Sequence, residues 1–104
     1  MSEITTVIAE EAVALVANGM PLVDVREQDE WDTIHAPEAV LIPLSQLRER
    51  LADLPEGRFL VMCHSGGRSA RAVDFLAREG YDAVNVDGGI MAWPHAGGAT
   101  VPAA

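Results

Sequence analysis

The segment that most constrains the fold is residues 59–62, a run of four apolar residues that ends at Cys63. A strand that is apolar on both faces suits the centre of a sheet covered by helices on each side, as in parallel sheets. Mainly apolar runs of three or four residues predict further strands at 22–25, 40–42 and 83–86. We therefore expect a sheet that is buried on both faces.

Segments with helical spacing separate these predicted strands. Residues 10–19 have acids in the first turn and stop at an Asn-Gly pair, and residues 26–31 return to polar character. Ser45 is placed to cap a helix over 46–51, and a further helix is predicted from Ser69 to Gly80. Short strands alternating with helices predict βαβ units in an α/β layered fold with a parallel sheet.

Size and charge exclude several classes of protein. A chain of 104 residues with 49% hydrophobic content and no shift in composition predicts one folded domain over residues 1–104. Seven Arg and no Lys against sixteen acids give a formal charge of −9, the wrong sign for a binder of nucleic acid or anionic membranes. No apolar run approaches about 18 residues, so we expect a soluble, cytoplasmic protein. The Gly, Ala and Pro content after Trp93 predicts a loose tail.

The loop after the predicted central strand carries the candidate chemistry. A thiol between a buried strand and a helix faces backbone N–H groups and the positive end of the helix dipole, which lower its pKa and favour the thiolate. Two glycines let the backbone fold around an anion, and an arginine adds positive charge. The alternative is that the chain's single cysteine only fills the core. The loop reads Cys63-His64-Ser65-Gly66-Gly67-Arg68-Ser69.

Other polar residues are interpreted mainly as structural. Asp24 and Arg26 point to the same side at the end of a strand, and we expect them to form an ion pair or anchor a loop in support of the site, with direct contact to the substrate as the alternative. His35 is expected to fix its loop by a hydrogen bond rather than to act in catalysis. The acidic group at residues 27–32 is interpreted as a solvated face. Because the histidines and the cysteine lack ligand spacing, we expect no metal and no other cofactor.

Several motifs, in order, resemble a single-domain rhodanese over about residues 4–101. This resemblance implies a rhodanese-like, three-layer α/β/α fold with a mainly parallel five-stranded sheet. It also implies that the loop cysteine accepts a sulfane sulfur as a persulfide. Two positions depart from the family's G-H-I-P-G-A motif, since Ile34 and Glu38 replace its glycines. The motifs are residues 22–27, 35–39, 42–44, 63–69 and 88–93.

The resemblance implies a thiosulfate sulfurtransferase that forms a Cys63 persulfide and holds it with the loop from His64 to Ser69. Since the chain has no second cysteine, the acceptor must be external: cyanide, a thiol or a sulfur-accepting protein. Arg68 and Arg71 would form a small cationic spot for an anionic donor, although Arg71 is equally well interpreted as a solvated helix residue.

Two alternative functions are weighed against sulfur transfer. One is a non-catalytic rhodanese-like module that docks a partner or carries sulfur. The other is a phosphatase or arsenate reductase, whose relatives in this fold space cysteine and arginine as C-x5-R. The spacing from Cys63 to Arg68 is C-x4-R, which resembles the sulfurtransferases instead.

Overall fold

The structure, a computed structural model, describes residues 3–103 as a parallel sheet between two layers of helices. The strands lie in the order β1-β5-β4-β2-β3, and every neighbouring pair is parallel. β4 is central and fully apolar beyond its first residue, which confirms the expected α/β fold. The strands are β1 (Thr6–Val7), β2 (Leu22–Asp24), β3 (Ala39–Leu41), β4 (Arg58–Met62) and β5 (Asp82–Val86).

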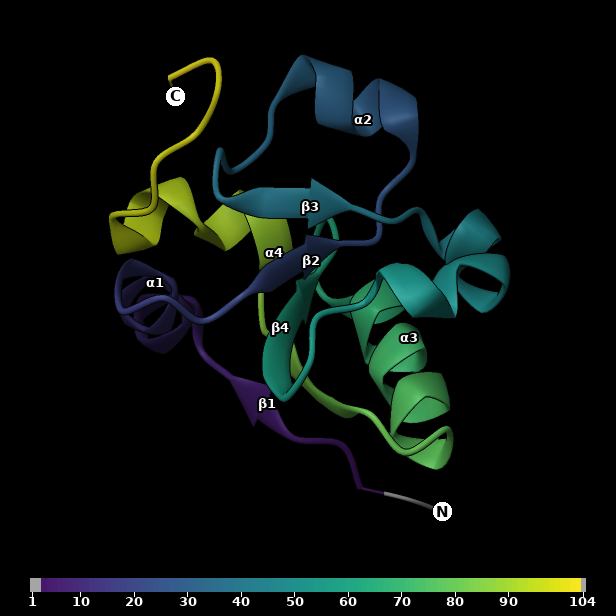
Figure 1. Ribbon diagram of the computed structural model, residues 1–104. Coiled ribbons are helices and arrows are strands. Elements are labelled where there is room, and N and C mark those ends of the chain that lie inside the picture. Colours follow the sequence, from purple (N-terminus) through teal and green to yellow (C-terminus); the bar gives the residue numbers. More distant parts are fainter. Residues whose placement is uncertain (1–2, 104) are drawn as a thin grey trace.

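Helices cover both faces of the sheet (Figure 1). On one face, side chains of α1 and α4 join those of the sheet in a core that includes Ala12, Ile90 and Trp93. On the other face, α3 and a 3₁₀ helix, η1, build a second core around Phe59 and Leu76. The layers are therefore helix, sheet and helix, as expected. The helices are α1 (Ala9–Ala17), α2 (Gln28–Thr33), η1 (Leu44–Asp53), α3 (Gly67–Arg78), α4 (Gly89–Ala92) and the 3₁₀ helix η2 (Pro94–Ala96).

Three local details differ from the sequence-based expectation. β1 is a strand of two residues, too short for an apolar pattern to reveal. The prediction that Ser45 caps a helix is wrong, because Pro43 holds the N-cap position of η1 and Ser45 donates its hydroxyl to Glu27 at 2.9 Å. The segment after Trp93 is fastened rather than loose, since Val101 and His35 exchange two backbone hydrogen bonds. No helix within residues 3–103 is long and apolar enough to cross a membrane.

The strand order places a crevice at the carboxyl ends of β2 and β4. These strands are neighbours, with Asp24 beside Met62. From β2 the chain continues through α2 to β3 on one side, and from β4 it continues through α3 to β5 on the other. Ligands in open α/β sheets bind where connections part in this way. The loop that begins at Cys63 lies at this crevice.

Candidate active site

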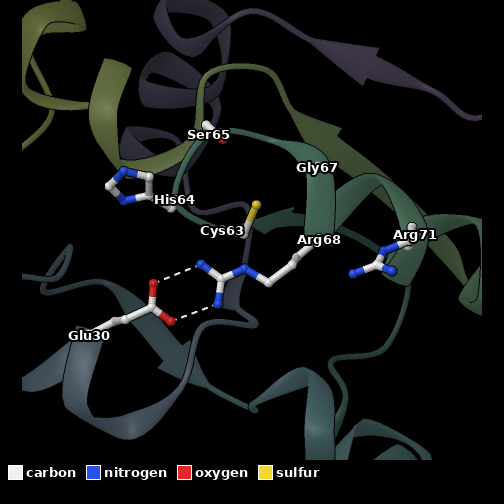
Figure 2. A pocket seen from close by; sticks show the side chains of 7 residues that line it. All are labelled: Glu30, Cys63, His64, Ser65, Gly67, Arg68 and Arg71. Atoms are coloured by element: carbon white, nitrogen blue, oxygen red, sulfur yellow. Dashed lines mark hydrogen bonds and ion pairs between the residues drawn. The ribbon is translucent and has the colours of Figure 1, made fainter.

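Cys63 follows β4 directly, and its side chain lies within the curve of the loop that leads to α3 (Figure 2). Gly66 has a φ of 118°, a left-handed conformation that glycine adopts without steric cost, and it directs its N–H to the Cys63 Sγ at 3.1 Å. The residue is only 1% exposed. A pocket nevertheless opens onto it. The pocket is lined by Glu30, Cys63, His64, Ser65, Gly67, Arg68 and Arg71.

The surroundings of Cys63 favour the thiolate. Burial raises the pKa of the thiol, but hydrogen bonds from the Ser69 hydroxyl and from the backbone N–H groups of Ser69, Gly66 and Ser65 outweigh burial and bring the pKa below 9.0. The sulfur also lies near the start of α3, a helix of 12 residues whose N-terminal end carries a partial positive charge. A cysteine in these surroundings is suited to act as a nucleophile.

The first turn of α4 holds the Cys63 loop from the opposite side. The backbone N–H groups of Ile90 and Met91 donate to the carbonyls of Cys63 and His64 at 2.8 and 3.1 Å. A Cβ on Gly89 would lie 2.7 Å from the His64 carbonyl oxygen and closer still to that of Cys63. Gly89 is therefore required by this close backbone contact. Residues 88–93 were one of the motifs of the family resemblance, and the part of Gly89 in holding the site is visible only in three dimensions.

Arg68 is paired with Glu30, which the sequence analysis assigned to a solvated face. The Arg68 guanidinium donates to both Glu30 carboxylate oxygens, at 2.6 and 2.7 Å. Figure 2 shows the guanidinium turned toward α2 for this contact. The hydrogen bonds from Arg68 lower the Glu30 pKa from 4.5 to about 2, and those to Glu30 raise the pKa of Arg68. Arg68 was expected to add positive charge beside the thiol, and the structure shows that this charge is balanced by Glu30.

Asp24 and Arg26 form a buried ion pair that anchors α2 beside the site. The Arg26 Nη2 lies 2.8 Å from the Asp24 Oδ2, and the side chains are 2% and 0% exposed. Arg26 also donates to the backbone carbonyls of Glu30 and Ile34, at 3.2 and 2.7 Å. The expected ion pair is therefore present. Through it, β2 sets the position of the helix that carries Glu30.

Arg71 is the cation of the pocket without a carboxylate partner. Its side chain is exposed and lines the pocket one helical turn beyond Arg68. Across residues 3–103 the Arg71 guanidinium has no hydrogen bond or ion pair. His64 also lines the pocket, whereas His35 stacks on Trp31 outside it. No group of three metal-binding side chains occurs in the described part of the chain.

Asn85 is a site residue that the sequence analysis missed. It lies on β5, is 5% exposed, and its Oδ1 is 2.6 Å from the Ser69 Oγ. Ser69 in turn lies 3.3 Å from the Cys63 Sγ. A signal was present in the sequence, since Asn85 is an uncharged polar residue inside the apolar run 83–86.

The comparisons with known proteins agree with this architecture. The Rhodanese-like domain family matches residues 8–96. The chain belongs to the rhodanese-like family. It is 33% identical to thiosulfate sulfurtransferase GlpE of Pseudomonas syringae, covering 89% of this chain and 90% of that protein. It is 45% identical to "Probable adenylyltransferase/sulfurtransferase MoeZ" of Mycobacterium tuberculosis over 71% of this chain, which spans only 20% of that protein. A rhodanese-like domain protein of Staphylococcus aureus superposes with a TM-score of 0.81 at 31% identity, over 86% of this chain and 91% of that one.

The two departures from the rhodanese motif are compatible with the backbone of this rhodanese-like chain. Ile34 has a φ of −163°, an extended conformation that any residue adopts. Glu38 is exposed, and no residue other than glycine has a positive φ within the described chain. Glycine is therefore unnecessary at both positions.

Proposed function

We propose that this protein is a sulfurtransferase that carries a sulfane sulfur as a persulfide on Cys63. The observation that carries the proposal is the Cys63 sulfur itself, buried in a loop that donates N–H groups to it and open to a pocket. Family membership supports sulfur transfer, as do relatives named as sulfurtransferases in Pseudomonas syringae and Allochromatium vinosum.

The proposed reaction is a pair of displacements at sulfur. The Cys63 thiolate attacks the outer sulfur of thiosulfate, a new S–S bond forms, and sulfite leaves with the electron pair of the broken S–S bond. The persulfide anion then occupies the loop, where backbone N–H groups from Ser65 to Ser69 stabilise its charge. Cyanide or a thiolate attacks the terminal sulfur, forms thiocyanate or a new persulfide, and restores the Cys63 thiolate.

Arg71 supports an anionic donor. With Arg68 balanced by Glu30, the Arg71 guanidinium is, within residues 3–103, the free positive charge at the pocket rim. Attraction between unlike charges raises the local concentration of a dianion such as thiosulfate. We expect Arg71→Ala to raise KM for thiosulfate about threefold to tenfold with little change in kcat. Arg78→Ala removes the same charge from the far end of α3 and is the matched control.

The experiment that tests the function is intact-protein mass spectrometry after incubation with thiosulfate and then with cyanide. We expect wild-type protein to gain one sulfur atom and to lose it as thiocyanate is released. Cys63→Ser, which keeps the size of the side chain, should gain none. Absence of the gain in reduced, folded wild-type protein would contradict thiosulfate as the donor, and mercaptopyruvate and a protein persulfide would be tried next.

A sulfur-carrier role is the second candidate function. A single cysteine that can hold one sulfur atom suits a carrier as well as it suits a sulfurtransferase enzyme. A relative in Bacillus subtilis named as a sulfur carrier is 36% identical over 69% of this chain. A carrier would be loaded once and would need a partner protein, whereas an enzyme releases many equivalents of thiocyanate per chain. Counting thiocyanate against protein therefore separates the two roles. Hydrolysis of p-nitrophenyl phosphate tests the phosphatase alternative in the same preparation.

A further inference from the structure

The Ser69 hydroxyl has more hydrogen-bond acceptors within reach than protons to donate. It lies 2.6 Å from the Asn85 Oδ1, 3.2 Å from the Gly66 carbonyl oxygen and 3.3 Å from the Cys63 Sγ. A serine hydroxyl has a single proton to donate. Ser69 is 0% exposed and Asn85 5%, so bulk water does not relieve this competition. The direction of the hydroxyl therefore decides which acceptor is satisfied.

The short contact with Asn85 fixes that direction. Two oxygens at 2.6 Å need a proton between them, because their lone pairs would otherwise repel. While the Asn85 oxygen faces Ser69, the hydroxyl proton lies mainly on that 2.6 Å contact, and the 3.3 Å hydrogen bond from Ser69 to the sulfur is the weaker of the two. A thiolate or persulfide at Cys63 is the only charged acceptor of the three, and hydrogen bonds to charged acceptors are the stronger ones.

We propose that Asn85 is a positioning residue that controls the charge on the Cys63 sulfur through Ser69. When the sulfur is anionic, the Asn85 amide is turned so that its Nδ2 donates to the Ser69 Oγ and the Ser69 hydroxyl donates to the sulfur. When the sulfur is a neutral thiol, the amide presents Oδ1 and takes the Ser69 proton. For the thiolate this inference stands alone, and for the persulfide it rests on the proposed function.

An asparagine is the side chain that allows both arrangements. Its amide carries a donor and an acceptor on one carbon, and rotation by about 180° about the Cβ–Cγ bond exchanges them. An ionised aspartate at this position could only accept, and would hold the Ser69 proton away from the sulfur. Leucine has nearly the same shape and neither donates nor accepts. These two replacements therefore separate donation from acceptance.

The test is the pH dependence of Cys63 alkylation by iodoacetamide, which reports the thiolate and requires no sulfur donor. We expect Asn85→Asp to raise the Cys63 pKa by about 1, a tenfold smaller thiolate fraction at neutral pH. Asn85→Leu should reduce the fraction about twofold to threefold, because Ser69 loses the donor that strengthens its own hydrogen bond. Asn18→Asp adds the same charge at an exposed site on the α1 C-cap and is the matched control.

The proposal requires that both substitutions at Asn85 change the Cys63 pKa through Ser69. In a Ser69→Ala background we expect Asn85→Asp and Asn85→Leu to change the Cys63 pKa by less than half as much as with Ser69 present. Equal changes in both backgrounds would show that Asn85 acts on the sulfur independently of Ser69 and would overturn the proposal. An unchanged or lowered Cys63 pKa in Asn85→Leu would also overturn the proposal. That result would mean that Asn85 acts only as an acceptor and competes with the sulfur for the Ser69 proton. Asn85→Leu buries no charge and remains informative if Asn85→Asp does not fold, which a thermal melt would show.

Discussion

Replacing Glu30 by glutamine isolates the charge that holds α2 against the active-site loop. Glutamine keeps a side-chain oxygen for the Arg68 guanidinium, and at the N3 position it can also keep the capping-box contact with the Glu27 backbone N–H. What is lost is the negative charge on the carboxylate. We expect Glu30→Gln to lower the free energy of unfolding at pH 7 by about 1–2 kcal/mol.

The magnitude follows from the pKa of Glu30. A fall from 4.5 to about 2 corresponds to about 3.5 kcal/mol, at about 1.4 kcal/mol for each pKa unit. The Glu30 and Arg68 side chains are 30% and 31% exposed. Solvent screening therefore reduces the stabilisation by this ion pair to a value between those of exposed and buried ion pairs. Because the folded pKa is lowered, the stabilisation is complete above pH 4.5 and is lost as the pH falls toward 2.

Urea denaturation of wild type and Glu30→Gln at pH 7, 4 and 3 measures this difference. We expect the gap in the free energy of unfolding to be largest at pH 7 and to narrow steadily below about pH 4.5. Asp29→Asn removes a carboxylate from the same turn of α2, one that forms no ion pair among the described residues, and should change the free energy by less than about 0.5 kcal/mol. A gap that is constant down to pH 3, or no larger than that of Asp29→Asn, would refute the reasoning.

Three further predictions concern the supports of the site. Gly89→Ala should lower the unfolding free energy, measured by urea titration, by about 3 kcal/mol or more and abolish sulfur loading, because the new Cβ meets backbone carbonyls. Gly57→Ala is the control: Gly57 has a φ of +73° with open space around it, and the substitution should cost about 1 kcal/mol. Asp24→Asn should cost about 3 kcal/mol in the same assay, since it leaves Arg26 buried without its counter-charge, and a loss no greater than that of the exposed Asp82→Asn would contradict this. Wild-type Cys63 should reach half-maximal alkylation below pH 9.0, and a midpoint at or above that value would contradict the lowered pKa.

The layered fold was predictable because its signals are local. The apolar run before Cys63 can be buried on both faces only at the centre of a covered sheet, and it forms β4. The strand-to-helix loop after it presents its N–H groups to whatever side chain begins the loop, so the surroundings of Cys63 follow from adjacent residues. β1 was not predictable, since two residues are too few to carry an apolar pattern. The start of η1 and its 3₁₀ geometry were not predictable either, and Pro43 holds the N-cap position expected for Ser45.

The sequence by itself determined the candidate nucleophile, because Cys63 is the single cysteine and its loop lies next to it along the chain. Only the tertiary structure decided the partners of that loop. Glu30 reaches Arg68 across 38 residues because the strand order places β2 beside β4, and Asn85 reaches Ser69 because β5 lies on the other side of β4. In the sequence, Glu30 is one of several acids at residues 27–32, and Asn85 is a polar residue within an apolar strand. Neither position shows in the sequence which residue it will contact. Pairing depends on which strands are neighbours, and that order is set by packing of the whole domain.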